Sequence, residues 1–184
     1  MIFGLFSRSP NKDLIDKLHG EIMAGARQPA LYLDLGVDDT FEGRFEMLAL
    51  HGALTVRRLR RFPEPGPDLA QQLTDGIFRH LDATLREMGV GDITVPKRMK
   101  KHAQAFVGRA QAYGEALDAQ DDGALQLALS RNVYGDESRA TALQTQALAH
   151  YVHAVEAALS ACDPDLFLQG RIGFPSPVAP GAST

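Results

Sequence analysis

Histidine offers the widest chemical range in this sequence, because imidazole can bind a metal ion or transfer a proton near neutral pH. His150 and His153 lie three residues apart, a spacing at which two side chains of one helix can share a metal ion. Neither a cysteine nor an obvious third ligand accompanies them, so a surface or half-buried pair is the competing interpretation. His51 and His102 sit beside apolar helix positions, which favours hydrogen-bonded packing residues over catalytic bases.

Nucleophiles and acid–base pairs are equally sparse. The single cysteine, Cys162, falls at a predicted helix C-terminus, where the helix dipole disfavours a thiolate. Asp121 and Asp122 are adjacent and are typical of a helix start rather than of a catalytic pair. The sequence contains no phosphate-binding glycine loop, no dinucleotide-binding motif and no HExxH motif. We therefore predict a protein that is not an enzyme and that uses no cofactor and no metal ion.

Two short basic runs are better candidates for a binding function. Residues 57–61 end one predicted helix, where cations suit the helix dipole. Residues 97–101 begin another helix, where four cations oppose the dipole. Cations kept at the unfavourable end indicate a partner such as a lipid headgroup or a client protein, and a solvated helix face is the alternative. We predict that this second run contacts a partner through Lys97, Lys100 and Lys101.

Composition limits the class of protein. A chain of 184 residues with 45% hydrophobic and 23% charged residues is long enough for one domain with a substantial core. The formal net charge of −4 argues against a dedicated nucleic-acid-binding domain, which is usually basic. One cysteine excludes an intramolecular disulfide and a cysteine-rich metal site, and it fits a reducing cytoplasm.

The first residues form a short apolar run. It is shorter than the apolar region of a signal peptide and has no basic stretch before it, and no later segment approaches the length of a membrane-spanning helix. The run could touch a lipid interface, or it could fray or pack on the domain. The candidate membrane contacts are Ile2, Phe3, Leu5 and Phe6.

The elements that must position these residues are all helical by periodicity. Asp39, followed three residues later by Glu42, resembles a capping box ahead of a helix that reaches about Arg61. Prolines at 63, 65 and 67 predict an extended connection to a long helix that ends at Gly89. That helix should bury a regular apolar stripe, formed by Leu69, Leu73, Ile77, Leu81, Leu85 and Met88.

Surface pairs and later helices follow the same logic. The long helix carries Asp75 with Arg79 and Asp82 with Arg86, each at a spacing of four residues. Pro96 starts the next helix, a shorter one follows Asp121, and a last one should bury Leu143, Leu148, Tyr151, Val155 and Leu159. No alternating strand pattern appears.

The predicted fold is therefore all-α, a single domain of about six helices in which long antiparallel helices pack as an irregular bundle. We expect the helical domain to span residues 11–174. Residues 1–10 are expected to be a flexible or membrane-touching N-terminus, and residues 175–184 a disordered Pro/Gly tail.

Four sequence blocks carry a family resemblance. Residues 38–51, which read DDTFEGRFEMLALH, resemble the ubiquinol–cytochrome c chaperone family. The blocks LREMGVGDITVPKRMKK, FVGRAQAY and ALSRNVYG, at residues 85–101, 106–113 and 128–135, resemble the same family in the same order. The similarity extends from about Leu31 to Phe174, and the absence of a long targeting extension is similar to the bacterial form rather than the mitochondrial one.

The resemblance implies a non-catalytic, all-helical chaperone that binds newly made cytochrome b, or an early complex III intermediate, during assembly of ubiquinol–cytochrome c reductase. The expected location is the cytoplasm, with a peripheral contact to the inner face of the cytoplasmic membrane left open. A general helical adaptor that recruits proteins to the membrane or ribosome is the alternative. No specific nucleic acid and no small-molecule substrate is expected as a partner.

The blocks also supply candidate contact residues. A turn of mixed charge between two long helices suits a client whose loops emerge from a membrane. The competing explanation is structural, with Gly89 and Gly91 shaping the turn, Arg86 paired to Asp82 and Asp92 capping the next helix. The predicted partner-binding residues, beyond the three lysines, are Arg44, His51, Arg86, Glu87 and Asp92.

Overall fold

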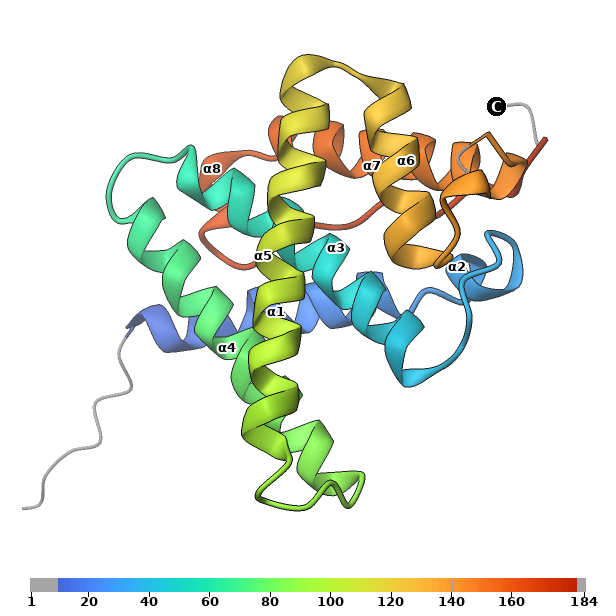
Figure 1. The fold of residues 1–184 in the computed structure, drawn as a ribbon. Helices are drawn as coiled ribbons and strands as arrows, with labels where there is room; N and C mark the ends of the chain where they lie inside the picture. The colour runs from blue at the N-terminus through green and yellow to red at the C-terminus, as the bar shows by residue number, and fades with distance from the viewer. Residues whose placement is uncertain (1–9, 140, 182–184) are drawn as a thin grey trace, which may run out of the picture.

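A computed structural model describes residues 10–139 and 141–181, and every regular element in these ranges is helical. The predicted all-α fold is thereby confirmed. The six longer helices pack around one another (Figure 1). The short elements α2 (Pro29–Leu33) and η1 (Glu137–Arg139) lie in connections between them, and α8 (Pro164–Phe167) follows the last of them. The longer helices are α1 (Pro10–Ala26), α3 (Phe41–Arg60), α4 (Gly66–Glu87), α5 (Val95–Ala119), α6 (Asp122–Val133) and α7 (Leu143–Ala161).

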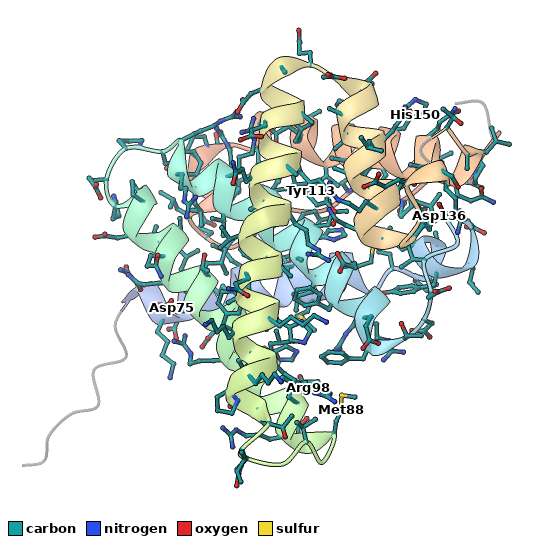
Figure 2. The ribbon with its side chains drawn as sticks, in the orientation of Figure 1. Asp75, Met88, Arg98, Tyr113, Asp136 and His150 are labelled. Atoms are coloured by element: carbon teal, nitrogen blue, oxygen red, sulfur yellow. The ribbon has the colours of Figure 1, made fainter. Side chains whose placement is uncertain are left out.

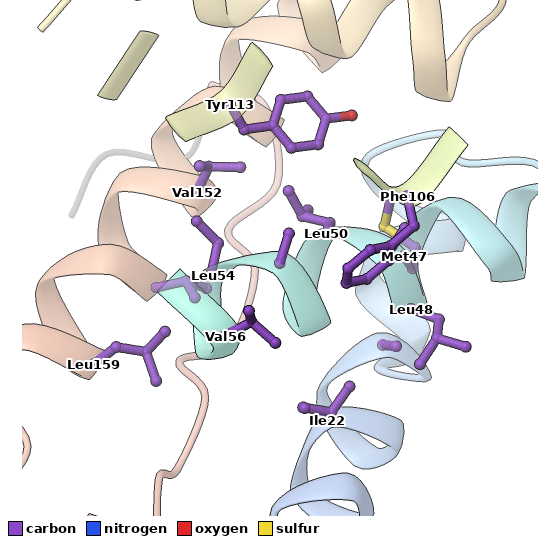
Figure 3. Close-up of a cluster of buried hydrophobic side chains, with 14 of the residues drawn as sticks. Ile22, Met47, Leu48, Leu50, Leu54, Val56, Phe106, Tyr113, Val152 and Leu159 are labelled. Carbon is purple, nitrogen blue, oxygen red and sulfur yellow. The ribbon is translucent and has the colours of Figure 1, made fainter. Parts of the chain in front are cut away.

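Helix α3 is the centre of the domain. Fourteen of its twenty residues are buried, and it contacts α1, α4, α5, α6 and α7. A helix buried to this extent must be surrounded by other helices. Figure 3 shows Leu50 and Leu54 of α3 among side chains of neighbouring helices. At Gly52 a Cβ atom would lie 2.9 Å from Ile77 Cδ1, so the glycine lets α4 approach closely.

The apolar stripe of α4 is confirmed except at its end. Leu69, Leu73, Ile77, Leu81 and Leu85 are at most 3% exposed. Met88 is 55% exposed because the helix ends at Glu87, one residue before it. Leu143 is also at a helix end, as the first residue of α7, and it is exposed although an inward position was predicted.

Two of the predicted helix caps are wrong, and one is confirmed. Thr40, not Asp39, caps α3, because its Oγ1 accepts a hydrogen bond from the Gly43 N–H at 3.1 Å. Asp39 instead pairs with Arg44. Asp121 caps α6 as expected, accepting from the Ala124 N–H. Asp92 does not cap α5, because Thr94 occupies that position.

The predictions on the surface of α4 divide in the same way. Arg86 pairs with Asp82 at 2.7 Å, as expected. Asp75 accepts a hydrogen bond from Gln71 and forms no ion pair with Arg79. The proline-rich connection is a tight turn rather than an extended segment, because the Gly66 N–H donates to the Pro63 carbonyl and α4 starts there.

The C-terminal segment returns across the domain to α1 and α3. The Phe174 ring lies edge-on to the His51 ring at 4.9 Å, and the Gln28 amide donates to the Pro175 carbonyl at 3.0 Å. Pro177 is buried. A Cβ atom at Gly25 would lie 2.6 Å from the Phe174 ring, so this glycine makes room for the returning chain. The predicted domain boundary at Phe174 stays a prediction.

The end of α4 and the start of α5 form a hairpin that extends beyond the other helices (Figure 1). Gly89, with a φ of +77°, ends α4, and α5 begins at Val95. Among residues 10–139 and 141–181, no helix combines the length and the apolar character that crossing a bilayer requires.

Candidate partner-binding surface

A groove is lined by six residues of the first sequence block and by Met88 of the second. Its volume is about 460 Å³, and it runs between α1, the start of α3 and the end of α4. Phe45, Leu48 and Leu81 form an apolar floor, and Arg27, Arg44 and His80 are on its walls. The remaining lining residues are Met23, Ala26, Tyr32, Asp39, Thr40, Phe41, Thr84 and Met88.

This groove has the composition of a protein-binding cleft, with an apolar centre and a polar margin. Met23 and Met88 can adapt their unbranched side chains to different apolar groups. Arg44 is exposed at the margin and pairs with Asp39 at 2.6 Å, and this guanidinium lowers the pKa of the Asp39 carboxyl. Of the residues predicted to bind a partner, only Arg44 lines this groove.

Arg86, Glu87 and Asp92 lie on the exposed hairpin beyond the groove. The Arg86 guanidinium bridges Asp82 and Asp92, at 2.7 and 2.6 Å. The pair of Arg86 with Asp82 agrees with the structural explanation of this turn. Asp92 is an ion-pair partner of Arg86 and not a helix cap. As contacts for a partner, these residues stay predictions.

His51 cannot offer its side chain to a partner in this structure, because it is completely buried. Its Nδ1 lies 2.7 Å from the Met47 carbonyl, which can only accept, so Nδ1 carries the proton. Its Nε2 then accepts from the Tyr151 hydroxyl at 2.7 Å. Burial lowers the pKa of His51 to about 4. The alternative interpretation of His51, as a hydrogen-bonded packing residue, is the correct one.

An ion pair that the sequence analysis missed joins the first block to the third. Glu46 of α3 accepts both branches of the Arg109 guanidinium of α5. Glu46 is only 7% exposed, and its burial raises the pKa of the carboxyl, an effect that Arg109 opposes. A signal was present in the sequence, since Glu46 lies between Phe45 and Met47 in an apolar helix and thus required a buried partner.

The two basic runs have different surroundings. In residues 57–61, Arg57 and Arg61 both bind Asp118 and Glu156, with distances between 2.6 and 3.2 Å. The Arg58 guanidinium covers the Phe62 ring at 4.5 Å. This run therefore joins α3 to α5 and α7.

The second run forms no such contacts. Lys97, Arg98, Lys100 and Lys101 are all exposed. Among the described residues, none of the four takes part in an ion pair. Figure 2 shows Arg98 near the start of α5 and Met88 close to the end of α4.

The other side chains considered for chemistry in the sequence include His153 and Cys162, and their surroundings favour structural roles. His153 Nε2 lies 2.8 Å from an Asp122 oxygen, which ties α7 to α6. Burial and the neighbouring Asp163 raise the pKa of the Cys162 thiol, which disfavours the nucleophilic thiolate. In the described part of the chain, no three side chains of metal-binding type come together. Ile2, Phe3, Leu5 and Phe6 lie outside the described residues.

Comparison with known proteins decides the family. A family model described as "Ubiquinol-cytochrome C chaperone" matches residues 33–174, which include all four sequence blocks. The chain belongs to the ubiquinol–cytochrome c chaperone family. Membership in a family of chaperones supports the expectation of a non-catalytic protein.

Two relatives of this chaperone-family chain show how far the similarity reaches. It is 28% identical over 149 residues to "Protein CBP3, mitochondrial" from Saccharomyces cerevisiae, and the match covers 79% of this chain but 44% of that protein. The chain thus spans less than half the length of the yeast relative. The crystal structure of a Cbp3 homolog from Brucella abortus is 38% identical, covers 90% of both chains and superposes with a TM-score of 0.78.

Proposed function

We propose that this protein is a non-catalytic assembly chaperone that holds newly made cytochrome b during biogenesis of ubiquinol–cytochrome c reductase. The observation that carries the proposal is the apolar groove between α1, α3 and α4, formed in part by the blocks that characterise the family. We place its action on the cytoplasmic side of the membrane.

The chemistry of the client explains the groove. A membrane protein that has just been made exposes apolar segments that later contact lipid or other subunits. A chaperone that only holds such a segment needs a concave apolar surface and a polar margin, and it needs no nucleotide. Leu48 and Leu81 supply the floor, and Arg44 and Arg27 can contact polar loops or backbone carbonyls of the client. Arg86 and Glu87 do not line the groove but directly precede Met88, which does, so we propose them as further polar contacts together with Asp92.

Affinity capture of the tagged protein from its host, in mild detergent, tests the proposal. Cytochrome b should be enriched over abundant membrane proteins. Met88→Glu places a charge in the groove at an exposed position, and we expect it to lower the capture about tenfold, which corresponds to 1.4 kcal/mol. Leu127→Glu is the matched control, because Leu127 is an exposed apolar residue of α6 that does not line the groove.

Equal capture by wild type and Met88→Glu would show that the groove is not the client site. Failure to enrich cytochrome b at all, with assembled reductase still present in a deletion strain, would refute the proposed function itself.

A general adaptor for the membrane or ribosome is the second candidate, and the unpaired basic run at residues 97–101 favours it. An adaptor that works through these cations should bind less tightly as salt is raised, and it should be indifferent to cytochrome b. Capture at low and high salt therefore separates the two candidates.

A further inference from the structure

The hairpin between α4 and α5 presents charge and apolar surface together at its end. We define the hairpin tip as residues 89–101. Ile93, at 96% exposed, is the most exposed large apolar side chain of the described chain, and it precedes Lys97 by four residues. Because α4 and α5 carry the tip away from the other helices (Figure 1), a flat surface can reach it without obstruction.

The charge of the tip differs from that of the whole protein. The tip holds four of the 19 cations and one of the 23 acids, whereas the chain carries a net charge of −4. The one acid, Asp92, is already paired with Arg86. The cations also lie in the first turns of α5, where the helix dipole repels them and favours an anion. An anionic partner would remove this unfavourable arrangement.

We propose that the hairpin tip docks on a bilayer surface that contains anionic lipids, with Ile93 entering the headgroup region and Lys97, Arg98, Lys100 and Lys101 binding lipid phosphates. Basic residues beside an apolar side chain are the combination that binds such an interface. A nucleic acid would supply the same phosphates, but it offers nothing to Ile93, and the tip has no aromatic side chain on which a base could stack.

This docking would bring the groove to the place where a membrane client emerges. Met88 lines the groove and directly precedes the tip. The proposal does not rest on the client being cytochrome b, since lipid binding by the purified protein requires no client. Ile93→Ser changes no residue predicted to bind the client, so it should bind lipid less tightly yet still capture its client in detergent, and the two proposals fail separately.

Vesicle flotation with the full chain tests the proposal. Wild type should float with vesicles of phosphatidylcholine and phosphatidylglycerol and remain unbound with phosphatidylcholine alone. Exchanging Lys97, Lys100 and Lys101 for Gln should lower the binding constant about 100-fold, since each cation near an anionic surface contributes about fivefold. Ile93→Ser should lower it about tenfold through the loss of buried apolar area.

The matched control removes three other exposed cations that form no ion pair within residues 10–139 and 141–181, by K12Q, R60Q and R79Q together. It changes the net charge equally and should retain most of the binding. An equal loss of lipid binding in both triple variants would show that only the net charge of the protein matters, and it would overturn the proposal. Lipid binding that is retained in the tip variant would also overturn the proposal. The binding would then come from another region of the chain, such as residues 1–9, which all variants share. Binding of single-stranded RNA that is lost with the lysines but unaffected by Ile93→Ser, without lipid binding, would identify a nucleic-acid surface instead.

Discussion

The last turn of α3 and the first turns of α5 carry basic runs of similar composition, but their surroundings are opposite. Arg57 and Arg61 face Asp118 and Glu156, which come from two other helices. The cations at residues 97–101 face solvent. Cations at the end of a helix suit its dipole, and cations at its beginning oppose it. The first run therefore stabilises the fold, whereas the second is retained at an electrostatic cost and is available for binding.

The comparison extends to the interior next to each run. The packed side of α3 also holds His51, whose two ring nitrogens both have partners inside the protein. The tip of the α4–α5 hairpin has a much smaller interior, because Val95 is its one buried residue. Perturbations of the packed side should lower stability, whereas perturbations of the tip should weaken binding without lowering stability.

The largest effect that we predict is a loss of stability in acid that depends on His51. The unfolded chain takes up a proton near pH 6.5, whereas the folded ring stays neutral until about pH 4, so the folded state loses stability as the pH falls through this window. The contribution is about 3 kcal/mol at full extent. Urea unfolding of wild type between pH 7 and about pH 4 measures it, compared with His51→Gln.

His51→Gln should unfold with a shallower dependence on pH, whatever its stability at pH 7. An unchanged pH dependence would mean that the ring is hydrated or already charged in the folded protein. The packed side of α3 would then be less dry than its burial indicates.

A smaller effect should separate two arginines of the same run. Arg57→Ala should lower the free energy of unfolding by about 2 kcal/mol, because hydrogen bonds to two carboxylates are lost and Glu156 stays partly buried. Arg60→Ala, which removes an exposed cation without an ion pair, should change it by less than about 0.5 kcal/mol. Chemical unfolding of both variants checks this. Equal values would contradict a structural role for the paired network.

The smallest effect should come from the tip. Replacing Lys97, Lys100 and Lys101 by Gln should raise the free energy of unfolding by roughly 0.5 kcal/mol at low ionic strength, because it relieves repulsion from the dipole of α5. Thermal unfolding at low and high salt measures this gain, which should shrink as salt is added. A clear loss of stability would show that the lysines support the fold, and the contrast between the two runs would then be wrong.

Part of the candidate site could be predicted from the sequence. The α4–α5 turn, the exposed charge of residues 97–101 and the position of Arg44 near the start of a helix all follow from local signals. The groove could not be predicted, because its floor combines Leu48 of α3 and Leu81 of α4. Neither segment alone shows how these two helices pack against each other. The hydrogen-bond partner of His51 could not be predicted for the same reason, since Tyr151 lies 100 residues away, although a packing role for His51 was one of its two interpretations.

The sequence by itself determined the helices and most of their ends, because apolar spacing, prolines and glycines act within a few residues of one another. Its errors at Asp39 and Met88 are shifts of a single residue at helix ends. Only the tertiary structure decided which charged and polar groups find partners on other helices, whereas the pair of Asp82 and Arg86 within α4 followed from its spacing. Burial and ion pairing depend on what another helix brings within about 4 Å, and that distance is set by packing of the whole chain.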